Sequence, residues 1–335
     1  MRLIIPKISN FYHVSLYVCD EFISTIDALQ VGEICSTHRV LDKLLLKYLQ
    51  YGSMPSWNKN GSACFSIAMG IDSIPGVNTL LQSNLRILYL FDAWPDKHTR
   101  IEKIVKHLKI DLLLVSSSQS ASMLQVRLPR TKVLFCPEAC KVEEYKCKPL
   151  IDRKIDLLQL GRRYEPVHKA LIADSGLNYL YQKESGSLTF ATQDLLKQGF
   201  ADSKLSLCFP KTMTHPVESG GVETVTNRYF QSIASKCLVI GKAPQELIQI
   251  FGYNPVVELD LKDPLGHVKK ILDNITDYES FIEHNYTILK RDHTWLNRWL
   301  FSQNEIKKLS RCKRYKRTYF GYLAQKEHFC WLILS

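Results

Sequence analysis

Short apolar runs alternate with helix-length amphipathic segments along the chain from residue 85 onwards. The strands of a parallel sheet are buried on both faces and are apolar throughout, whereas the helices that cover the sheet are apolar on one face only. The runs at 85–91, 110–115 and 132–135 fit such strands, and Ile101, Ile104, Val105 and Leu108 share one face of the helix between the first two. The alternation predicts an α/β fold with a parallel sheet.

The same alternation starts again after a charged stretch without periodicity at residues 137–153. A chain of 335 residues exceeds the usual size of a single core, so we expect two domains. We predict doubly wound domains at residues 1–150 and 151–310, followed by a tail at 311–335. The predicted strands of the second domain are 155–160, 177–181, 204–209, 237–240 and 256–259, and its predicted helices are 165–173, 190–199, 223–235, 244–251, 265–272, 278–289 and 294–309.

The first 84 residues have a weaker pattern. They predict a strand at 14–18 and helices at 20–29 and 39–48.

The chain carries 44 Lys and Arg against 33 Asp and Glu, a net charge of +11 that favours anionic partners. Five of these basic residues crowd into the tail: Arg311, Lys313, Arg314, Lys316 and Arg317. The body is therefore only mildly basic, and without a nucleic-acid-binding motif we expect no nucleic-acid partner. The tail fits an anionic membrane surface, and it fits equally a terminal helix packed on the first domain or a disordered end.

Ten cysteines are scattered without a disulfide framework, and neither a signal-peptide pattern nor a membrane-length apolar run is present. We therefore expect a cytoplasmic protein. Cys136, Cys140 and Cys147 lack the paired spacing and the fourth ligand of a zinc site. Buried free thiols and no metal are the expectation.

In a doubly wound fold, ligands bind beyond the carboxyl ends of the strands. Gly161, Arg162 and Arg163 follow the predicted strand 155–160. Glycine permits a tight turn, and a guanidinium can bind phosphate oxygens in bidentate fashion. This segment fits a phosphate-binding turn or an ordinary solvated basic turn.

A second candidate is the glycine-containing loop that precedes the predicted helix 223–235. Gly220, Gly221 and Val222 lead directly into that helix. Close backbone approach and the positive end of a helix dipole make an anion site, so we expect phosphate binding here.

Polar residues recur every four positions on the predicted helix 223–235. Glu223, Asn227 and Gln231 share one stripe, with Arg228 on its flank. At 1.5 Å per residue the stripe is about 12 Å long, which suits a ligand with a sugar, a diphosphate and a ribose in line. An ordinary helix with a polar outer face would have the same pattern.

The segment ETVTNRYFQSIASKCLVIG at 223–241 resembles the donor-site helix of retaining glycosyltransferases with the GT-B fold, in which two Glu are separated by seven residues. It is most similar to the spore-maturation-type subgroup, which pairs an Arg-aromatic-Phe segment with a terminal His-Thr-aromatic and Arg signature. The matching residues are Arg228, Tyr229, Phe230, His293, Thr294, Trp295 and Arg298. The resemblance covers residues 151 to about 301 and extends to the first domain only by architecture. It departs from the family at Gln231, where the family has Glu, and at Lys236, where the family has a small residue, usually Gly.

The resemblance implies a GT-B architecture, in which two Rossmann-like domains face a central cleft. It implies transfer, with retention, of a sugar from a nucleotide-diphosphate-sugar to a glycan or glycolipid acceptor in cell-surface polysaccharide synthesis. Glu223 would contact the donor sugar and Gln231 the ribose. Arg162, Arg228 and the amides of Gly220 and Gly221 would contact the diphosphate, with Gly161, Arg163, Val222 and Asn227 completing the donor site.

The sequence has no Asp-x-Asp pair, so we expect metal independence and no cofactor beyond the nucleotide sugar. The acceptor would bind the first domain, where Asp92, Trp94 and His98 follow the predicted strand 85–91. For Trp94 core packing is the alternative, and helix capping is an alternative use of the acidic residues in this turn.

Two other classes of function compete with the glycosyltransferase. Gln231 and Lys236 favour a GT-B-like binding or coat protein without turnover. A nicotinamide-dependent oxidoreductase would need a Gly-x-Gly-x-x-Gly turn, which the sequence does not contain. The enzyme is expected in the cytoplasm, at the inner face of the plasma membrane if the tail binds lipid.

Overall fold

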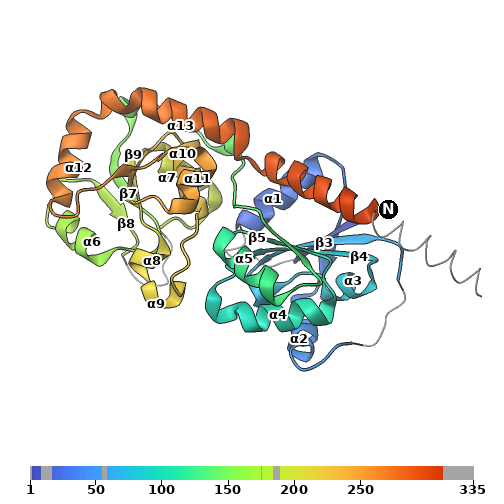
Figure 1. Ribbon diagram of the computed structural model, residues 1–335. Coiled ribbons are helices and arrows are strands. Elements are labelled where there is room, and N and C mark those ends of the chain that lie inside the picture. Colours follow the sequence, from blue (N-terminus) through green and yellow to red (C-terminus); the bar gives the residue numbers. More distant parts are fainter. Residues whose placement is uncertain (1, 9–16, 55–58, 175, 184–188, 312–335) are drawn as a thin grey trace, which may run out of the picture.

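The computed structural model describes residues 2–8, 17–54, 59–174, 176–183 and 189–311. Their strands form two sheets, parallel throughout, with helices packed around each (Figure 1). The α/β fold predicted from the alternation is confirmed.

The first sheet has six strands. In sheet order they are β2 (Glu33–Thr37), β1 (Leu3–Ile8), β3 (Ala63–Met69), β4 (Leu85–Phe91), β5 (Leu112–Val115) and β6 (Lys132–Phe135). The helices of this part are α1 (Tyr17–Ala28), α2 (Arg39–Leu49), α3 (Val77–Gln82), α4 (His98–Leu108) and α5 (Ser118–Arg127).

Strand β4 shows why the predicted strands are apolar throughout. Its Leu88 and Leu90 belong to one core, together with residues of α2 to α5. Its Ile87 and Tyr89 belong to the core on the other face, together with residues of α1. Because both faces of the strand are buried, every position of it is closed to water.

The prediction for the start of the chain is partly wrong. Tyr17 and Val18 lie in α1 instead of a strand, and the rest of the predicted strand 14–18 lies outside the described residues. Strands β1, β2 and β3 were not predicted. Strand β1 contains Pro6 and Lys7, and the edge strand β2 has no buried residue, so neither is a clear apolar run.

The second sheet has five strands and matches the sequence prediction closely. In sheet order they are β11 (Val257–Glu258), β10 (Leu238–Gly241), β9 (Ser203–Cys208), β7 (Ile155–Gln159) and β8 (Tyr179–Tyr181). The helices are α6 (Glu165–Ile172), α7 (Gln193–Ala201), α8 (Lys211–Thr214), α9 (Pro216–Ser219), α10 (Asn227–Ala234), α11 (Gln245–Phe251), α12 (Pro264–Asp273) and α13 (Glu279–Asp292). The chain changes direction between β7 and β9, which is where ligands bind in such sheets.

Helix α10 begins at Asn227, not at Glu223 as predicted. The carboxylate of Glu246 accepts hydrogen bonds from the Thr224 hydroxyl and the Val225 N–H, both at 3.1 Å. These bonds hold the segment before α10 in a non-helical conformation. Glu223 therefore does not share a helical stripe with Asn227 and Gln231.

Residues 295–311 are helical and pack on the first sheet, although the sequence predicted that this helix would close the second domain. Trp295 stacks on Phe22 of α1 with ring centroids 4.9 Å apart, and Trp299 lies in the same core. In Figure 1 this red helix runs alongside α1. The chain thus crosses between the sheets twice, near residue 138 and near residue 294.

His293 and Arg298, two residues of the family signature described above, lie where the chain crosses between the sheets, and Arg298 connects the two crossings by hydrogen bonds. Buried Arg298 donates hydrogen bonds to the carbonyl oxygens of Pro137 at 2.9 Å and Glu138 at 3.3 Å. The ring of His293 stacks on Phe251 at 4.7 Å. Burial, followed by the nearby Arg298, lowers the pKa of His293 to about 4, so the imidazole is neutral. These residues have a structural role at the crossing.

At the end of the helix of residues 295–311, Arg311 is exposed. Lys313, Arg314, Lys316 and Arg317, which the tail prediction concerns, lie outside the described residues. In the described part of the chain, no helix is long and apolar enough to cross a bilayer.

Candidate functional site

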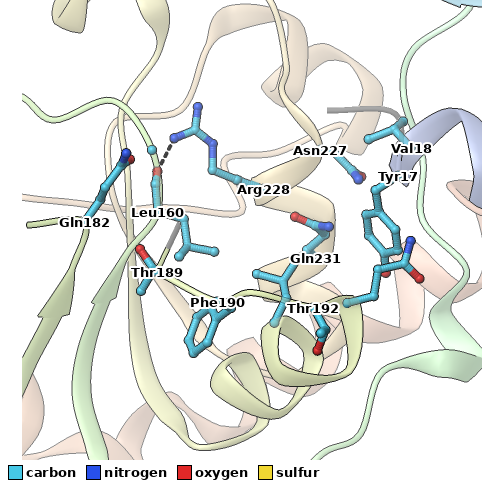
Figure 2. Close-up of a pocket in the computed structure, with 13 residues that line it drawn as sticks. Tyr17, Val18, Leu160, Gln182, Thr189, Phe190, Thr192, Asn227, Arg228 and Gln231 are labelled. Carbon is cyan, nitrogen blue, oxygen red and sulfur yellow. Dashed lines mark hydrogen bonds between the residues drawn. The ribbon is translucent and has the colours of Figure 1, made fainter. Parts of the chain in front are cut away.

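A pocket of about 290 Å³ opens between α1 of the first domain and α10 of the second (Figure 2). Tyr17 and Val18 line it on the side of α1, and Phe190 and neighbouring residues line it on the side of α7. Its full lining in the described residues is Tyr17, Val18, Leu160, Gly161, Gln182, Thr189, Phe190, Thr192, Gln193, Leu196, Asn227, Arg228 and Gln231. It lies next to the end of β7, where the direction of the sheet changes.

The turn after β7 brings Gly161 against Arg228 of α10. Arg228 donates a hydrogen bond to the carbonyl oxygen of Leu160, drawn as the dashed line in Figure 2. Gly161 has φ +68°, and a Cβ atom at this position would lie 2.8 Å from the Arg228 Nη1. Glycine is required here for both the left-handed backbone and the close approach of the guanidinium.

Arg162, next to Gly161, adds a second guanidinium. Burial, followed by the charge of Arg228, lowers the pKa of Arg162 to about 10. Among the described residues Arg162 forms no hydrogen bond or ion pair. Arg162 and Arg228 are neighbouring cations, and within the described ranges neither forms a hydrogen bond or ion pair with a carboxylate. Such a pair makes a site for an anion, and paired guanidiniums suit phosphate.

Lys211, at the start of α8, extends this cationic region toward the first domain. Its ammonium lies 3.9 Å from the ring centroid of Trp94 and 3.7 Å from a carboxylate oxygen of Glu218. Burial, followed by the charge of Arg162, lowers its pKa. Trp94 and Lys211 thus meet across the space between the two sheets.

Asn227 and Gln231 contribute side-chain amides to the pocket, and both are at least nine-tenths buried, with 7% and 5% exposed. Neither the Nδ2 nor the Oδ1 of Asn227 has a hydrogen-bond partner among the described residues. Buried amides are seldom left unpaired, because this costs about 1–3 kcal/mol. In Figure 2 the Asn227 side chain extends toward Tyr17 and Val18. The unpaired amide indicates a place for a polar ligand.

Gln231 is held from behind by a buried polar network. Its Nε2 donates to the Tyr145 hydroxyl at 3.1 Å, and that hydroxyl donates to the Glu21 carboxylate at 3.2 Å. The indole N–H of Trp295 donates to the other Glu21 oxygen at 3.0 Å. Burial raises the pKa of Glu21, and its hydrogen bonds oppose that shift. Because its nitrogen is engaged, Gln231 keeps its carbonyl oxygen as a hydrogen-bond acceptor for a ligand.

On the first-domain side, Asp92 and Trp94 line a second, smaller cavity together with Glu138 and Thr224. Asp92 stands at the end of β4 with φ +50°, in the left-handed region, and its carboxylate accepts a hydrogen bond from the Trp94 indole at 3.1 Å. Strained backbone of this kind gathers at functional sites. His98 is buried and paired with the carbonyl oxygen of Ala93 at 3.1 Å, outside the lining of this cavity.

Glu138 is a site residue that sequence reasoning missed. Burial of its carboxyl group, followed by the charge of Asp92, raises its pKa to about 8, although part of the side chain is exposed. The backbone N–H of Asn227 and the charge of Arg228 oppose this shift in the pKa of Glu138. The sequence signal was present, because Glu138 lies just beyond the end of β6.

The other predicted donor residues lie away from the pocket lining. Glu223 accepts a hydrogen bond from the Gln245 N–H at 2.8 Å, and its own N–H donates to Gln119 of the first domain at 2.9 Å. Gly220 and Gly221 have positive φ in the loop after α9, and Val222 is buried in that loop. Gly220 approaches Pro95 of the first domain.

Arg163 turns away from Arg228 and toward β8. Its Nη1 donates to the carbonyl oxygen of Gln182 at 3.3 Å, and its Nε pairs with Glu165 at 3.3 Å. The structure therefore brings Gly161, Arg162, Asn227, Arg228 and Gln231 together, and places Arg163, Gly220, Gly221, Val222 and Glu223 around them.

The described cysteines are all free thiols. Within the described ranges, no group of three His, Cys, Asp or Glu side chains is arranged to hold a metal ion.

No protein-family model matches the sequence, and no curated protein matches it either. Solved structures do match the fold. An alpha-glucosyltransferase in complex with UDP and a 13-mer DNA aligns with a TM-score of 0.58 at 10% identity, over 92% of this chain and 99% of the other. Sucrose-phosphate synthase from Thermosynechococcus elongatus aligns with a TM-score of 0.57 at 9% identity, over 93% and 100%.

A third structure, Anabaena HepE in complex with UDP-glucose, aligns with a TM-score of 0.56 at 10% identity, over 92% and 99% of the two chains. Nearly the whole length of each protein takes part in the alignment, so the likeness includes both sheets. The chain has the GT-B fold, in which two Rossmann-like domains face each other.

Proposed function

We propose that the chain is a glycosyltransferase that uses a nucleotide-diphosphate-sugar donor. The observation that carries the proposal is the pocket beside β7, where the unpaired buried amide of Asn227 lies on the same helix as Arg228, next to Arg162. A cationic pair and an unsatisfied amide together fit a ligand with both phosphate and hydroxyl groups.

The donor would be held along α10. Arg162 and Arg228 bind the diphosphate, and Lys211 lies close enough to Arg162 that the guanidinium charge lowers the pKa of Lys211. Gln231 accepts a hydrogen bond from a ribose hydroxyl, and the Asn227 amide binds a further hydroxyl. The base lies toward Phe190, which lines the pocket on the side of α7.

The leaving diphosphate gains negative charge as the glycosidic bond breaks, so prearranged guanidiniums stabilise the transition state more than the ground state. This role of protein cations supports transfer without a metal ion. Retention of the anomeric configuration is proposed from the resemblance at residues 223–241. Glu223 would reach the sugar only if its hydrogen bond to the Gln245 N–H opened.

The acceptor would enter from the first domain. Asp92 and Glu138 present carboxyl groups to the smaller cavity, and Trp94 presents an aromatic face beside Lys211. Carboxyl groups orient hydroxyls, and aromatic faces pack on sugar rings, so a glycan or glycolipid fits. A role in cell-surface polysaccharide synthesis is part of the proposal, with the basic tail at the inner membrane face.

The proposal is tested by a thermal-shift panel of nucleoside diphosphates and their sugars, with and without chelator. UDP and UDP-glucose come first, because they occupy two of the structures with this fold. A ligand at one hundred times its dissociation constant adds about 2.7 kcal/mol to the unfolding free energy. Arg228→Ala should abolish the shift, whereas Arg130→Ala, an exposed arginine beyond α5, should leave it unchanged.

Sugar transfer is then measured with the nucleotide that binds. Binding followed by turnover supports the enzyme. A shift without any turnover on a broad acceptor set favours a binding protein that retains the fold, and no shift with any nucleotide overturns the proposal.

A further inference from the structure

Helix α2 turns an apolar face to the solvent. Of its outward residues, Val40 is 72% exposed, Leu44 61% and Tyr48 53%, and Leu41 is 47% exposed. Tyr51, just beyond the helix, is 84% exposed. Large apolar side chains scattered singly over a surface are ordinary, but a row of them on one short helix marks an interaction site.

These side chains form a continuous stripe. Val40, Leu44 and Tyr48 recur every four residues and so lie one above the other, and Leu41 lies about 100° around the helix from Val40, at the edge of the stripe next to Tyr48. The stripe is about 100° wide, which is the width of the apolar face of an amphipathic helix. Here that face is directed outward.

The opposite side of α2 already has a partner, which fixes the orientation of the helix. Leu46 and Leu49 are buried in the core with α3 and α4. The buried carboxylate of Asp42 accepts hydrogen bonds from the N–H groups of Gly76 and Val77, each at 2.9 Å, at the start of α3. The helix therefore cannot roll to hide its outer stripe without breaking these contacts.

Basic residues run along one edge of the stripe. Lys43 and Lys47 are exposed, and Arg39 precedes them one turn earlier. Asp42 is the one acidic residue between residues 34 and 71, and it is buried beneath the helix. The exposed residues of α2 are thus mainly apolar or cationic.

We propose that α2 docks this protein on an anionic membrane surface. A helix lying in the interface buries an apolar face at the level of the headgroups while its lysines contact anionic lipids. The stripe together with Tyr48, Tyr51, Lys43 and Lys47 has this composition. Tyrosine is enriched at the membrane interface, and lysine stems extend toward the headgroups.

A protein partner fits the surface less well, since lysine is depleted at protein interfaces. The basic tail of this chain is also a poor occupant, because it has the same sign of charge as the edge of α2. Figure 1 shows α2 at the outer end of the first domain, beyond α4, so a flat surface can approach it. This docking surface does not depend on the proposed function.

The test is co-sedimentation of the full chain with vesicles of phosphatidylcholine alone and of phosphatidylcholine with phosphatidylglycerol. We expect binding to the anionic vesicles only. Lys43→Gln and Lys47→Gln should each weaken binding about fivefold, the equivalent of about 1 kcal/mol per charge. Leu44→Gln/Tyr48→Gln should weaken it more than tenfold. All four positions are exposed, so these variants keep the fold.

The matched control is Val126→Gln/Ile151→Gln, which removes two apolar side chains that are 84% and 90% exposed elsewhere, and should leave binding unchanged. Arg314→Gln/Lys316→Gln/Arg317→Gln tests the tail in the full chain. The proposal is overturned if the α2 variants bind like the unmutated protein, or if only the tail variant loses binding. It is also overturned if α2 mediates self-association, seen in sedimentation velocity as an oligomer that Leu44→Gln/Tyr48→Gln dissociates, without vesicle binding.

Discussion

Gln231→Glu would restore the residue expected from the glycosyltransferase resemblance, yet the structure predicts that it weakens nucleotide binding. The Tyr145 hydroxyl accepts from the Gln231 amide at 3.1 Å and donates its single proton to Glu21 at 3.2 Å. A glutamate at position 231 has no proton to give. The Tyr17 hydroxyl, 3.2 Å from that of Tyr145, can replace the amide as donor to Tyr145, but two carboxylates would still share the single Tyr145 proton.

The magnitude follows from the network. A buried acceptor left without its donor costs about 1–3 kcal/mol. Without nucleotide the new carboxylate can turn toward water in the pocket, and nucleotide binding returns it to the buried position, so this cost is subtracted from the binding free energy and corresponds to roughly 5- to 150-fold in affinity. The second carboxylate would also lie near buried Glu21, whose pKa is already raised by burial. Glu21→Gln/Gln231→Glu returns the cluster to one carboxylate and should recover affinity to within about threefold of the unmutated protein, because residues in one network are coupled.

The assay is isothermal titration of the nucleoside diphosphate into the four members of the cycle. Gln193→Glu is the control. Gln193 lines the same pocket from α7, so this substitution adds the same negative charge to the pocket outside the hydrogen-bond network. Glu21→Gln should not rescue that control. The reasoning is refuted if Gln231→Glu binds the nucleotide as tightly as the unmutated protein, or if Glu21→Gln fails to rescue it. In either case the hydrogen bonds of Tyr145 and Glu21 do not determine whether position 231 favours an amide over a carboxylate.

Four further predictions concern charge and strain around the pocket. Since the pKa of Glu138 is about 8, its carboxyl group gains charge beside the diphosphate as pH rises; titrations from pH 6 to 9 should show weakening affinity, and Glu138→Gln should remove that dependence. Arg228→Lys loses the fork geometry and should weaken nucleotide binding about 10-fold or more by the same titration, against Arg130→Lys as control. Asp92→Gly relieves a left-handed φ of +50° and should raise the unfolding free energy in urea by about 1 kcal/mol while lowering sugar transfer. The pKa of His293 is about 4 in the folded chain and about 6.5 when unfolded, so the unfolded chain binds the extra proton; stability should fall by up to roughly 3 kcal/mol between pH 6.5 and 4, and His293→Gln should flatten this loss.

The second domain could be predicted almost element by element, because its central strands β7, β9 and β10 are largely buried and apolar runs alternate with amphipathic helices. Leu157 and Leu158 of β7, for example, face two different cores. The edge strand β2 has no such signal, since none of its residues is buried. Burial alone does not decide which strands are predicted. Strand β3 is buried, but Ser66 interrupts its apolar run and it was missed, whereas β8 and β11 have no buried residue and were predicted.

Glu223 shows where local reasoning fails for the site. Its spacing from Asn227 suits a helix, but Glu246, more than twenty residues further along, binds Thr224 and Val225 and keeps this segment out of the helix. Glu246 also accepts from the N–H and hydroxyl of Ser118 in the first domain, both at 2.7 Å. Such contacts between domains have no periodicity in the sequence.

Lys236 stands where the family that the sequence resembles has a small residue, usually Gly, and its backbone conformation explains this preference. It has φ +53° just after α10, a conformation that glycine adopts without cost. Its ammonium lies 4.6 Å from the ring centroid of Tyr286 and pairs with Glu283 at 2.5 Å. These contacts offset the strain, so the substitution is compatible with the fold and affects α13, not the pocket.

The position of a bound nucleoside diphosphate tests the donor site most directly. In a crystal structure of the complex, we expect the diphosphate in contact with Arg162 and Arg228, and the ribose in hydrogen-bond contact with Gln231, with the Asn227 amide no longer unpaired. A diphosphate bound away from these arginines, with the pocket between α1 and α10 left empty, would contradict the proposed donor site.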